Sequence, residues 1–176
     1  MRVIAGRFGG RRLIAPAGRA TRPTSDRVRE ALFSILGSLE GARVLDLFAG
    51  SGALAIEALS RGAAEATLID SSAAAIAAIR RNLATLQAPA QVRRQNASTF
   101  LEQARADGRQ YDLVFVDPPY HQTSALVREL STALRPVLAP AARVVCESDR
   151  REPLELEIPL IDERRYGDTL IRIYGT

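Results

Sequence analysis

The chain has 176 residues, 47% of them hydrophobic, which is enough for one domain with a core of its own. It has one cysteine, Cys146, and one histidine, His121, which excludes an intrachain disulfide and the common zinc sites, so we predict no bound metal. We see no signal peptide and no apolar run near the ~20 residues of a transmembrane helix. We therefore expect a cytoplasmic protein without a membrane partner.

Positive charge is concentrated near the N-terminus. All 24 basic residues are arginines, and residues 1–30 contain eight of them against two acids, a net charge of +6. The remaining residues carry a net charge of −2. A local excess on a nearly neutral body favours an anionic partner at one place, the alternative being a solvated basic face. We expect these arginines to bind substrate rather than to stabilise the fold.

The first elements along the chain are short. Residues 2–5 and 11–15 are β-like runs around a glycine-rich turn, which predicts a β-hairpin. After a proline-containing loop, Thr24 or Ser25 can cap a helix, and apolar residues recur at helical spacing from residue 28 to residue 39. We predict a basic hairpin and loop over residues 1–24 and a larger domain over residues 25–176.

From residue 43, strands and helices alternate. The apolar patterns predict strands over 44–47, 67–69, 91–94, 113–116 and 143–147, and helices near 52–61, 76–86, 98–106 and 126–134. Two further strands, near 154–158 and 169–174, have no helix between them and could close the sheet as an antiparallel pair. This order predicts a doubly wound α/β fold.

A glycine turn, Gly50-Ser51-Gly52, follows the first of these strands and precedes a helix. Glycines allow close approach of a ligand, and the unpaired amides of a helix start favour a carboxylate or phosphate. Asp46 could accept hydrogen bonds from the loop or face a ligand ammonium. Asp70 ends the next strand, where an acid typically binds the two hydroxyls of a ribose. The turn also fits a looser dinucleotide pattern, so this feature alone leaves NAD possible.

The sequence Asp117-Pro118-Pro119-Tyr120 follows the apolar strand 113–116, at an end where α/β sheets bind ligands. The two prolines hold Asp117 and Pro118 extended, so that a carboxylate and a free carbonyl have fixed directions. Both are acceptors and match the two hydrogens of an –NH₂ group. Accepting these hydrogens localises the nitrogen lone pair and orients it toward a sulfonium methyl group. Tyr120 offers a flat face for a base, worth roughly 1–3 kcal/mol.

The chain resembles the bacterial 16S ribosomal RNA guanine-N2 methyltransferases of the RsmD type over nearly its full length. The matching segments are residues 2–6, 10–11, 22–24, 26–30, 46–52, 117–120 and 165–169. The glycine turn and the Asp-Pro-Pro-Tyr sequence occur in many amino-methyltransferases. The N-terminal segments are the more specific part of the resemblance.

The resemblance implies a Rossmann-like class I S-adenosylmethionine methyltransferase fold, with a mostly parallel seven-stranded sheet and an N-terminal β-hairpin extension. It implies methylation of the exocyclic N2 of one guanine in 16S rRNA, with the assembled small ribosomal subunit as the substrate. Asn96-Ala97 looks like the place where such enzymes bind the adenine of the cofactor. We expect a monomer that needs no obligate protein partner.

Three sets of site residues follow from the motifs and the resemblance. The predicted catalytic residues are Asp117, Pro118, Pro119 and Tyr120. The predicted S-adenosylmethionine contacts are Asp46, Phe48, Gly50, Ser51, Gly52, Asp70, Ser71, Asn96 and Ala97. The predicted RNA contacts are Arg7, Arg11, Arg12, Arg22 and Arg27, of which Arg27 could instead serve the cofactor pocket.

Several other functions use part of this pattern. A DNA adenine-N6 methyltransferase can use the same Asp-Pro-Pro-Tyr chemistry, but the chain lacks a large target-recognition insertion. Protein glutamine methylation would be expected to show Asn-Pro-Pro-Tyr. An NAD-linked oxidoreductase has no need of residues 117–120, and a non-catalytic RNA-binding module has no need of both motifs.

Overall fold

The structure is a computed structural model that describes residues 1–17, 25–118 and 124–175. Seven strands form one sheet in the order β3-β2-β1-β4-β5-β7-β6. The strands are β1 (Arg43–Asp46), β2 (Glu65–Asp70), β3 (Gln91–Arg94), β4 (Tyr111–Val116), β5 (Leu138–Asp149), β6 (Leu160–Tyr166) and β7 (Thr169–Gly175). The helices are α1 (Asp26–Leu36), α2 (Ala53–Ser60), α3 (Ala73–Leu86), α4 (Ala97–Ala106) and α5 (Ser124–Leu134), with a 3₁₀ turn at Arg135–Val137.

The sheet is mixed. Strands β1 to β5 run parallel to one another, whereas β7 is antiparallel to both β5 and β6. The prediction of a Rossmann-like α/β fold is confirmed, and an antiparallel pair closes the sheet, although β6 and not the predicted segment 154–158 is the partner of β7. The strand order reverses between β1 and β4, and ligands in such sheets bind beyond the carboxyl ends of the strands at this reversal.

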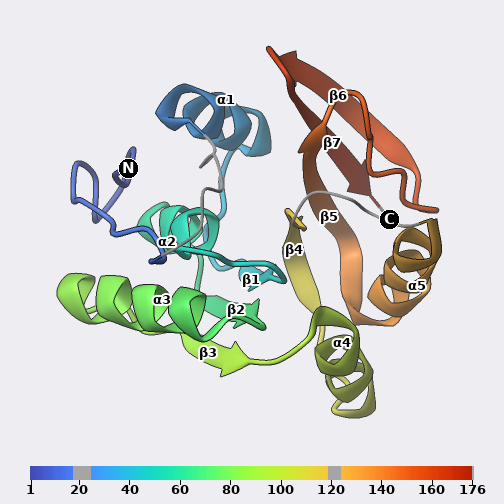
Figure 1. The fold of residues 1–176 in the computed structure, drawn as a ribbon, viewed down its shortest axis with the longest axis horizontal. Coiled ribbons are helices and arrows are strands. Elements are labelled where there is room, and N and C mark those ends of the chain that lie inside the picture. Colours follow the sequence, from blue (N-terminus) through green and yellow to red (C-terminus); the bar gives the residue numbers. More distant parts are fainter. Residues whose placement is uncertain (18–24, 119–123, 176) are drawn as a thin grey trace.

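Helices cover both faces of the sheet (Figure 1). Helices α1, α2 and α3 pack on one face, and α4 and α5 pack on the other. The β4 side chains alternate between the two cores, because Leu113 and Phe115 join the first cluster while Val114 and Val116 join the second. This double coverage explains why β4 reads as a continuous apolar run.

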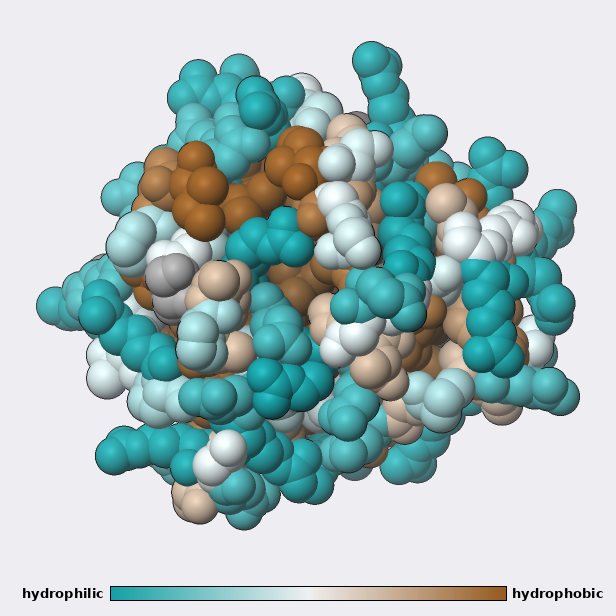
Figure 2. All heavy atoms as spheres, turned by 180° about the vertical axis from the view of Figure 1, so that it is seen from behind, coloured by the Kyte–Doolittle hydropathy of each residue, from teal (hydrophilic) through white to brown (hydrophobic). Residues whose placement is uncertain are grey.

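Hydrophilic side chains cover most of the back of the molecule, with smaller apolar areas between them (Figure 2). Two large apolar side chains stand out as exposed on the edge strand β6, Leu160 and Ile161. In the part of the chain that the structure describes, we find no helix with both the length and the apolar character needed to cross a bilayer.

One predicted element is shorter than expected and another is wrong. The N-terminal β-hairpin is present as a short antiparallel pairing, with a bridge between Arg2 and Arg12 and backbone hydrogen bonds from Val3 to Arg11 and from Leu13 to Met1. The pairing stops there because the amides of Ile4 and Ala5 bind the Glu57 carboxylate instead of a partner strand. The predicted strand at 154–158 is unpaired, and β6 begins at residue 160. The apolar residues that alternate within 154–158 are buried in the second core cluster, where the Leu156 amide binds the Tyr174 hydroxyl.

Candidate functional site

The glycine turn Gly50-Ser51-Gly52, which we call the glycine loop, lies at the carboxyl end of β1, directly before α2. Gly50 and Gly52 have φ angles of 53° and 79°, a region that favours glycine. A Cβ on Gly52 would lie 2.9 Å from the Leu68 Cδ2 atom, so a larger residue would require either the Leu68 side chain or the loop to shift. The sequence therefore needs glycine here both for the turn and for close packing.

Asp70 ties this loop to the next one. Its Oδ2 atom accepts a hydrogen bond of 2.9 Å from the Gly50 amide, and its Oδ1 atom accepts one of 2.8 Å from the Ser72 amide. An ionised carboxylate has about four acceptor positions, so two remain for hydroxyl groups of a ligand. Ser71, between Asp70 and the start of α3, is exposed.

Asp46 lies almost fully buried at the end of β1, with 2% of its surface exposed. Burial raises its pKa to about 7, and the negative charge of Asp70 acts in the same direction. The amides of Ala55 and Phe48 donate hydrogen bonds to the carboxylate and act in the opposite direction. Among the described residues, Asp46 forms no ion pair, so a positive ligand group next to it would gain a partner of opposite charge.

Asp117 follows β4 and lies beside the end of β5. Val116 pairs with Cys146, which brings Asp117 next to Glu147 on the neighbouring parallel strand. Asp117 reaches the surface, but the protein around its carboxyl group displaces water and raises its pKa well above the usual value. The negative charges of Glu147 and Asp46 add to this rise.

The structure thus brings three predicted acids, Asp46, Asp70 and Asp117, together at the carboxyl ends of β1, β2 and β4. We call this end of the sheet the acidic edge. Glu147 is a fourth acid that the sequence reasoning did not select, although its place at the end of a predicted strand could have indicated it. An acidic edge favours a cationic ligand and disfavours the pyrophosphate of NAD, which carries negative charge. The charge at this edge thus counts against NAD, which the glycine turn alone left possible.

The remaining predicted cofactor residues surround this edge. The Gln95 amide binds the Asp70 carbonyl at 3.1 Å, which places Asn96 next to the end of β2. Asn96 is exposed at the start of α4, and its side chain caps no helix amide. Ala97 is buried, and Phe48 and Ser51 are half-buried. Pro118 is half-buried, whereas Pro119 and Tyr120 lie outside the described residues.

The predicted RNA contacts are mostly exposed. Arg7, Arg11, Arg12 and Arg27 are all exposed, and Arg22 lies outside the described residues. The Arg7 guanidinium lies 5.2 Å from the centre of the Phe8 ring, and Arg11 donates to the Thr85 carbonyl at 3.4 Å. These contacts hold the two side chains loosely against the protein and leave their charge at the surface.

Arg29 corrects the expectation that the arginines of residues 1–30 have no part in stability. Its side chain is fully buried, and it donates hydrogen bonds of 2.6 Å to the Arg2 carbonyl and to the Asp26 carboxylate. A buried guanidinium with these partners joins α1 to the N-terminal segment. Position in a basic segment therefore does not by itself identify an RNA contact.

The backbone of residues 1–17, which we call the N-terminal strap, is anchored on α2. The fully buried Glu57 accepts the amides of Ile4 and Ala5, at 2.6 and 3.0 Å, and also pairs with Arg61. Ser60 accepts the Phe8 amide at 2.8 Å. A Cβ on Gly6 would lie 1.8 Å from the Ser60 carbonyl oxygen, so only glycine allows this approach. The sequence reasoning missed Glu57 and Ser60, which resemble ordinary residues of a helix.

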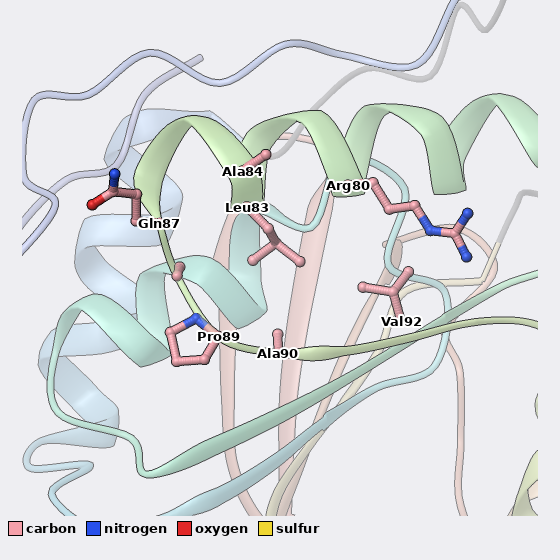
Figure 3. A pocket seen from close by; sticks show the side chains of 8 residues that line it. Arg80, Leu83, Ala84, Gln87, Pro89, Ala90 and Val92 are labelled. Atoms are coloured by element: carbon pink, nitrogen blue, oxygen red, sulfur yellow. The ribbon is translucent and has the colours of Figure 1, made fainter.

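An open groove lies elsewhere, along the C-terminal half of α3 and the start of β3 (Figure 3). Leu83, Gln87, Pro89 and Val92 are among the residues that line it. Because residues 87–90 precede β3, the groove reaches the amino end of the sheet, away from the acidic edge. Its lining includes none of the predicted site residues.

Comparison with known proteins identifies full-length relatives. The family model described as "Conserved hypothetical protein 95" matches residues 1–175. The chain is 48% identical over 124 residues to ribosomal RNA small subunit methyltransferase D of Escherichia coli K12. This alignment covers 69% of this chain and 61% of that protein. It is 33% identical to the enzyme of the same name from Haemophilus influenzae, over 99% of this chain and 93% of that protein. The solved structure of Thermus thermophilus protein TTHA0928 aligns with a TM-score of 0.86 at 29% identity, covering 100% of this chain and 99% of that one.

Proposed function

We propose that this chain, which belongs to the RsmD-type family of ribosomal RNA methyltransferases, transfers a methyl group from S-adenosylmethionine to the N2 atom of a guanine in 16S rRNA. The observation that carries the proposal is the acidic edge, where Asp70 holds the glycine loop and Asp46 lies near Asp117. Residues 25–176 form the methyltransferase domain in this proposal, and residues 1–24 contact the RNA. We further propose that the protein acts as a monomer.

The residues at the acidic edge fit the chemical groups of S-adenosylmethionine. The cofactor supplies an electrophilic methyl group on a positively charged sulfur. Asp46 would face its ammonium group, the amides of the glycine loop would face its carboxylate, and the free acceptor positions of Asp70 would bind the ribose hydroxyls. Asn96, which is exposed and adjacent to the end of β2, would contact the adenine.

Asp117 and the Pro118 carbonyl would accept the two hydrogens of the guanine N2 amine. This contact localises the lone pair of N2 and holds it in line for transfer. Formation of the N–CH₃ bond would accompany breakage of the bond between the methyl group and sulfur, whose electron pair stays on sulfur. N2 would give up one proton, and the raised pKa of Asp117 makes its carboxylate a better acceptor for that proton. A positive group of the cofactor held beside Asp46 would favour the ionised form of that carboxylate.

Incubation with tritiated S-adenosylmethionine tests the proposal. Small ribosomal subunits from cells that lack the enzyme, protein-free 16S rRNA and duplex DNA are offered separately. We expect label in the small subunits, and N2-methylguanosine in their nuclease digests by mass spectrometry. Label in DNA with none in the subunits would favour the alternative of an adenine-N6 methyltransferase.

A further inference from the structure

Asn82, on α3, is a buried amide that joins two parts of the site. Only 3% of its surface is exposed. Its Oδ1 atom accepts the Ile14 amide at 2.9 Å, and its Nδ2 atom donates to the Ile14 carbonyl at 3.0 Å. The same Nδ2 atom donates to the Ser51 carbonyl at 2.9 Å. One side chain therefore holds the N-terminal strap and the middle residue of the glycine loop.

The set of partners fixes the chemistry of this position. Two carbonyls need donors and one amide needs an acceptor, so an NH₂ group and a carbonyl oxygen are both required at the same place. A carboxylate at residue 82 would face the two carbonyl oxygens, and an apolar side chain would leave all three groups without this partner. A buried amide is costly unless its hydrogen bonds are made, so the joint favours one arrangement of strap and loop.

Further interactions connect the same two parts. The Ser51 hydroxyl lies 3.7 Å from the Met1 sulfur, in the geometry of a weak hydrogen bond. Helix α2 begins at the glycine loop, and its residues Glu57 and Ser60 anchor the strap on the N-terminal side of Ile14. The strap thus contacts α2 through Glu57 and Ser60 and α3 through Asn82, and Figure 1 shows it running beside these two helices.

We propose that Asn82 is a positioning residue that couples RNA binding by the N-terminal strap to cofactor binding by the glycine loop. This inference rests on the proposed function. A ligand on either part stabilises the arrangement in which the three hydrogen bonds of Asn82 are formed, and so favours binding of the other ligand. Such coupling is reciprocal, because each ligand must change the affinity of the other by the same factor.

The test measures the dissociation constant of S-adenosylhomocysteine, which cannot react, without and with saturating small ribosomal subunits. For the wild type we expect the subunits to lower this constant by about 5-fold or more, the lower end of typical coupling. For Asn82→Ala we expect the ratio of the two dissociation constants, without and with subunits, to be near one. Ile14→Pro removes the amide that Asn82 accepts but leaves the bond to Ser51, and it should lower the ratio as well. Thermal unfolding checks that each variant is folded, and Ile14→Pro carries the test if Asn82→Ala is not.

Ser60→Ala is the matched control. It loosens the same strap at Phe8 without touching the glycine loop, so it should weaken subunit binding while the ratio stays as in the wild type. A wild-type ratio in folded Asn82→Ala would overturn the inference and leave Asn82 a purely structural residue. Independent binding of both ligands to the wild type would also overturn it, with the proposed function intact. Failure of the wild type to bind either ligand would defeat the proposed function itself.

Discussion

The acidic edge and the N-terminal strap hold their charges in opposite ways. At the edge, the carboxylates of Asp46 and Asp70 are themselves fixed, because backbone amides donate to them. In the strap, the backbone is fixed by Glu57, Ser60 and Asn82, while the arginine side chains are exposed. The first arrangement suits one small cation in one geometry. The second suits a large polyanion, whose phosphates a mobile guanidinium can follow.

The same comparison explains why the two regions are separate. RNA phosphates near Asp46 and Asp117 would be repelled, and a cationic cofactor near Arg7 and Arg12 would be repelled as well. A substrate that spans both regions can place its backbone on the strap and insert one neutral base at the acidic edge. Changes in either region should therefore affect different steps.

The largest expected effect comes from removing the acceptor at the acidic edge. Asp117→Ala should lower kcat by about 10²–10⁴-fold, because it removes an acceptor of the N2 hydrogens and of the released proton. Asp117→Asn keeps one acceptor oxygen and should be less impaired. Single-turnover methylation of small subunits measures the rate, and calorimetry should find cofactor affinity nearly unchanged. Wild-type turnover by Asp117→Ala would remove this residue from the mechanism.

The sequence predicts the acidic edge well because its parts are local. A strand, a glycine turn and a helix start are consecutive, and the positions of Asp70 and Asp117 follow from the ends of strands that the apolar pattern marks. Parallel order then brings those ends to one edge. The observed bounds of most strands differ from the predicted bounds by a few residues, which leaves this conclusion unchanged.

The strap shows where such reasoning fails. Its anchors Glu57 and Asn82 lie 53 and 68 residues from their partners Ile4 and Ile14, and no local pattern links them. Residues 154–158 alternate like a strand because one side packs on a core, and alternation does not reveal whether the backbone finds a partner strand. Arg29 lies in the basic segment like an RNA contact, yet its environment is that of a core residue.

The next effect concerns the geometry of the same edge. Asp70→Ala should weaken binding of S-adenosylmethionine by about 1–3 kcal/mol, because it removes the ribose acceptor and frees the amides of Gly50 and Ser72. Asp107→Ala removes an exposed acid directly after α4 and serves as the charge-matched control. Calorimetry measures both. An unchanged dissociation constant for Asp70→Ala would mean that the ribose is bound elsewhere.

A smaller effect should follow from the strap. Replacing Arg7, Arg11 and Arg12 with Gln should weaken binding to small subunits and flatten its salt dependence, by roughly 0.7–0.9 in the log–log slope for each phosphate that the variant no longer binds. Cofactor affinity and Tm should change little. The control replaces three exposed arginines elsewhere, Arg105, Arg128 and Arg151. If both triple variants give the same slope, the strap is only a solvated basic surface.

The smallest expected effect is a pH dependence that distinguishes the buried carboxylates from the exposed arginines. Asp46 has a pKa of about 7 in the folded protein, above the ordinary value of 3.8 that it has when unfolded. Between these values the folded state keeps a proton that the unfolded state has released, so the contribution of Asp46 to stability falls as the pH rises toward 7. Cofactor binding should follow the opposite trend, since the ammonium group pairs only with the ionised carboxylate. We expect affinity for S-adenosylmethionine to rise between pH 6 and pH 8, by at most about 10-fold for the single group.

Variants identify the group that titrates. Asp46→Asn should bind weakly with a flatter profile, whereas the arginine triple variant should keep the wild-type profile, because guanidinium groups do not titrate in this range. The measurement is repeated with Asp117→Ala, which removes the other carboxyl group with a raised pKa at this edge. A profile that stays steep in Asp46→Asn would assign the titration to another group.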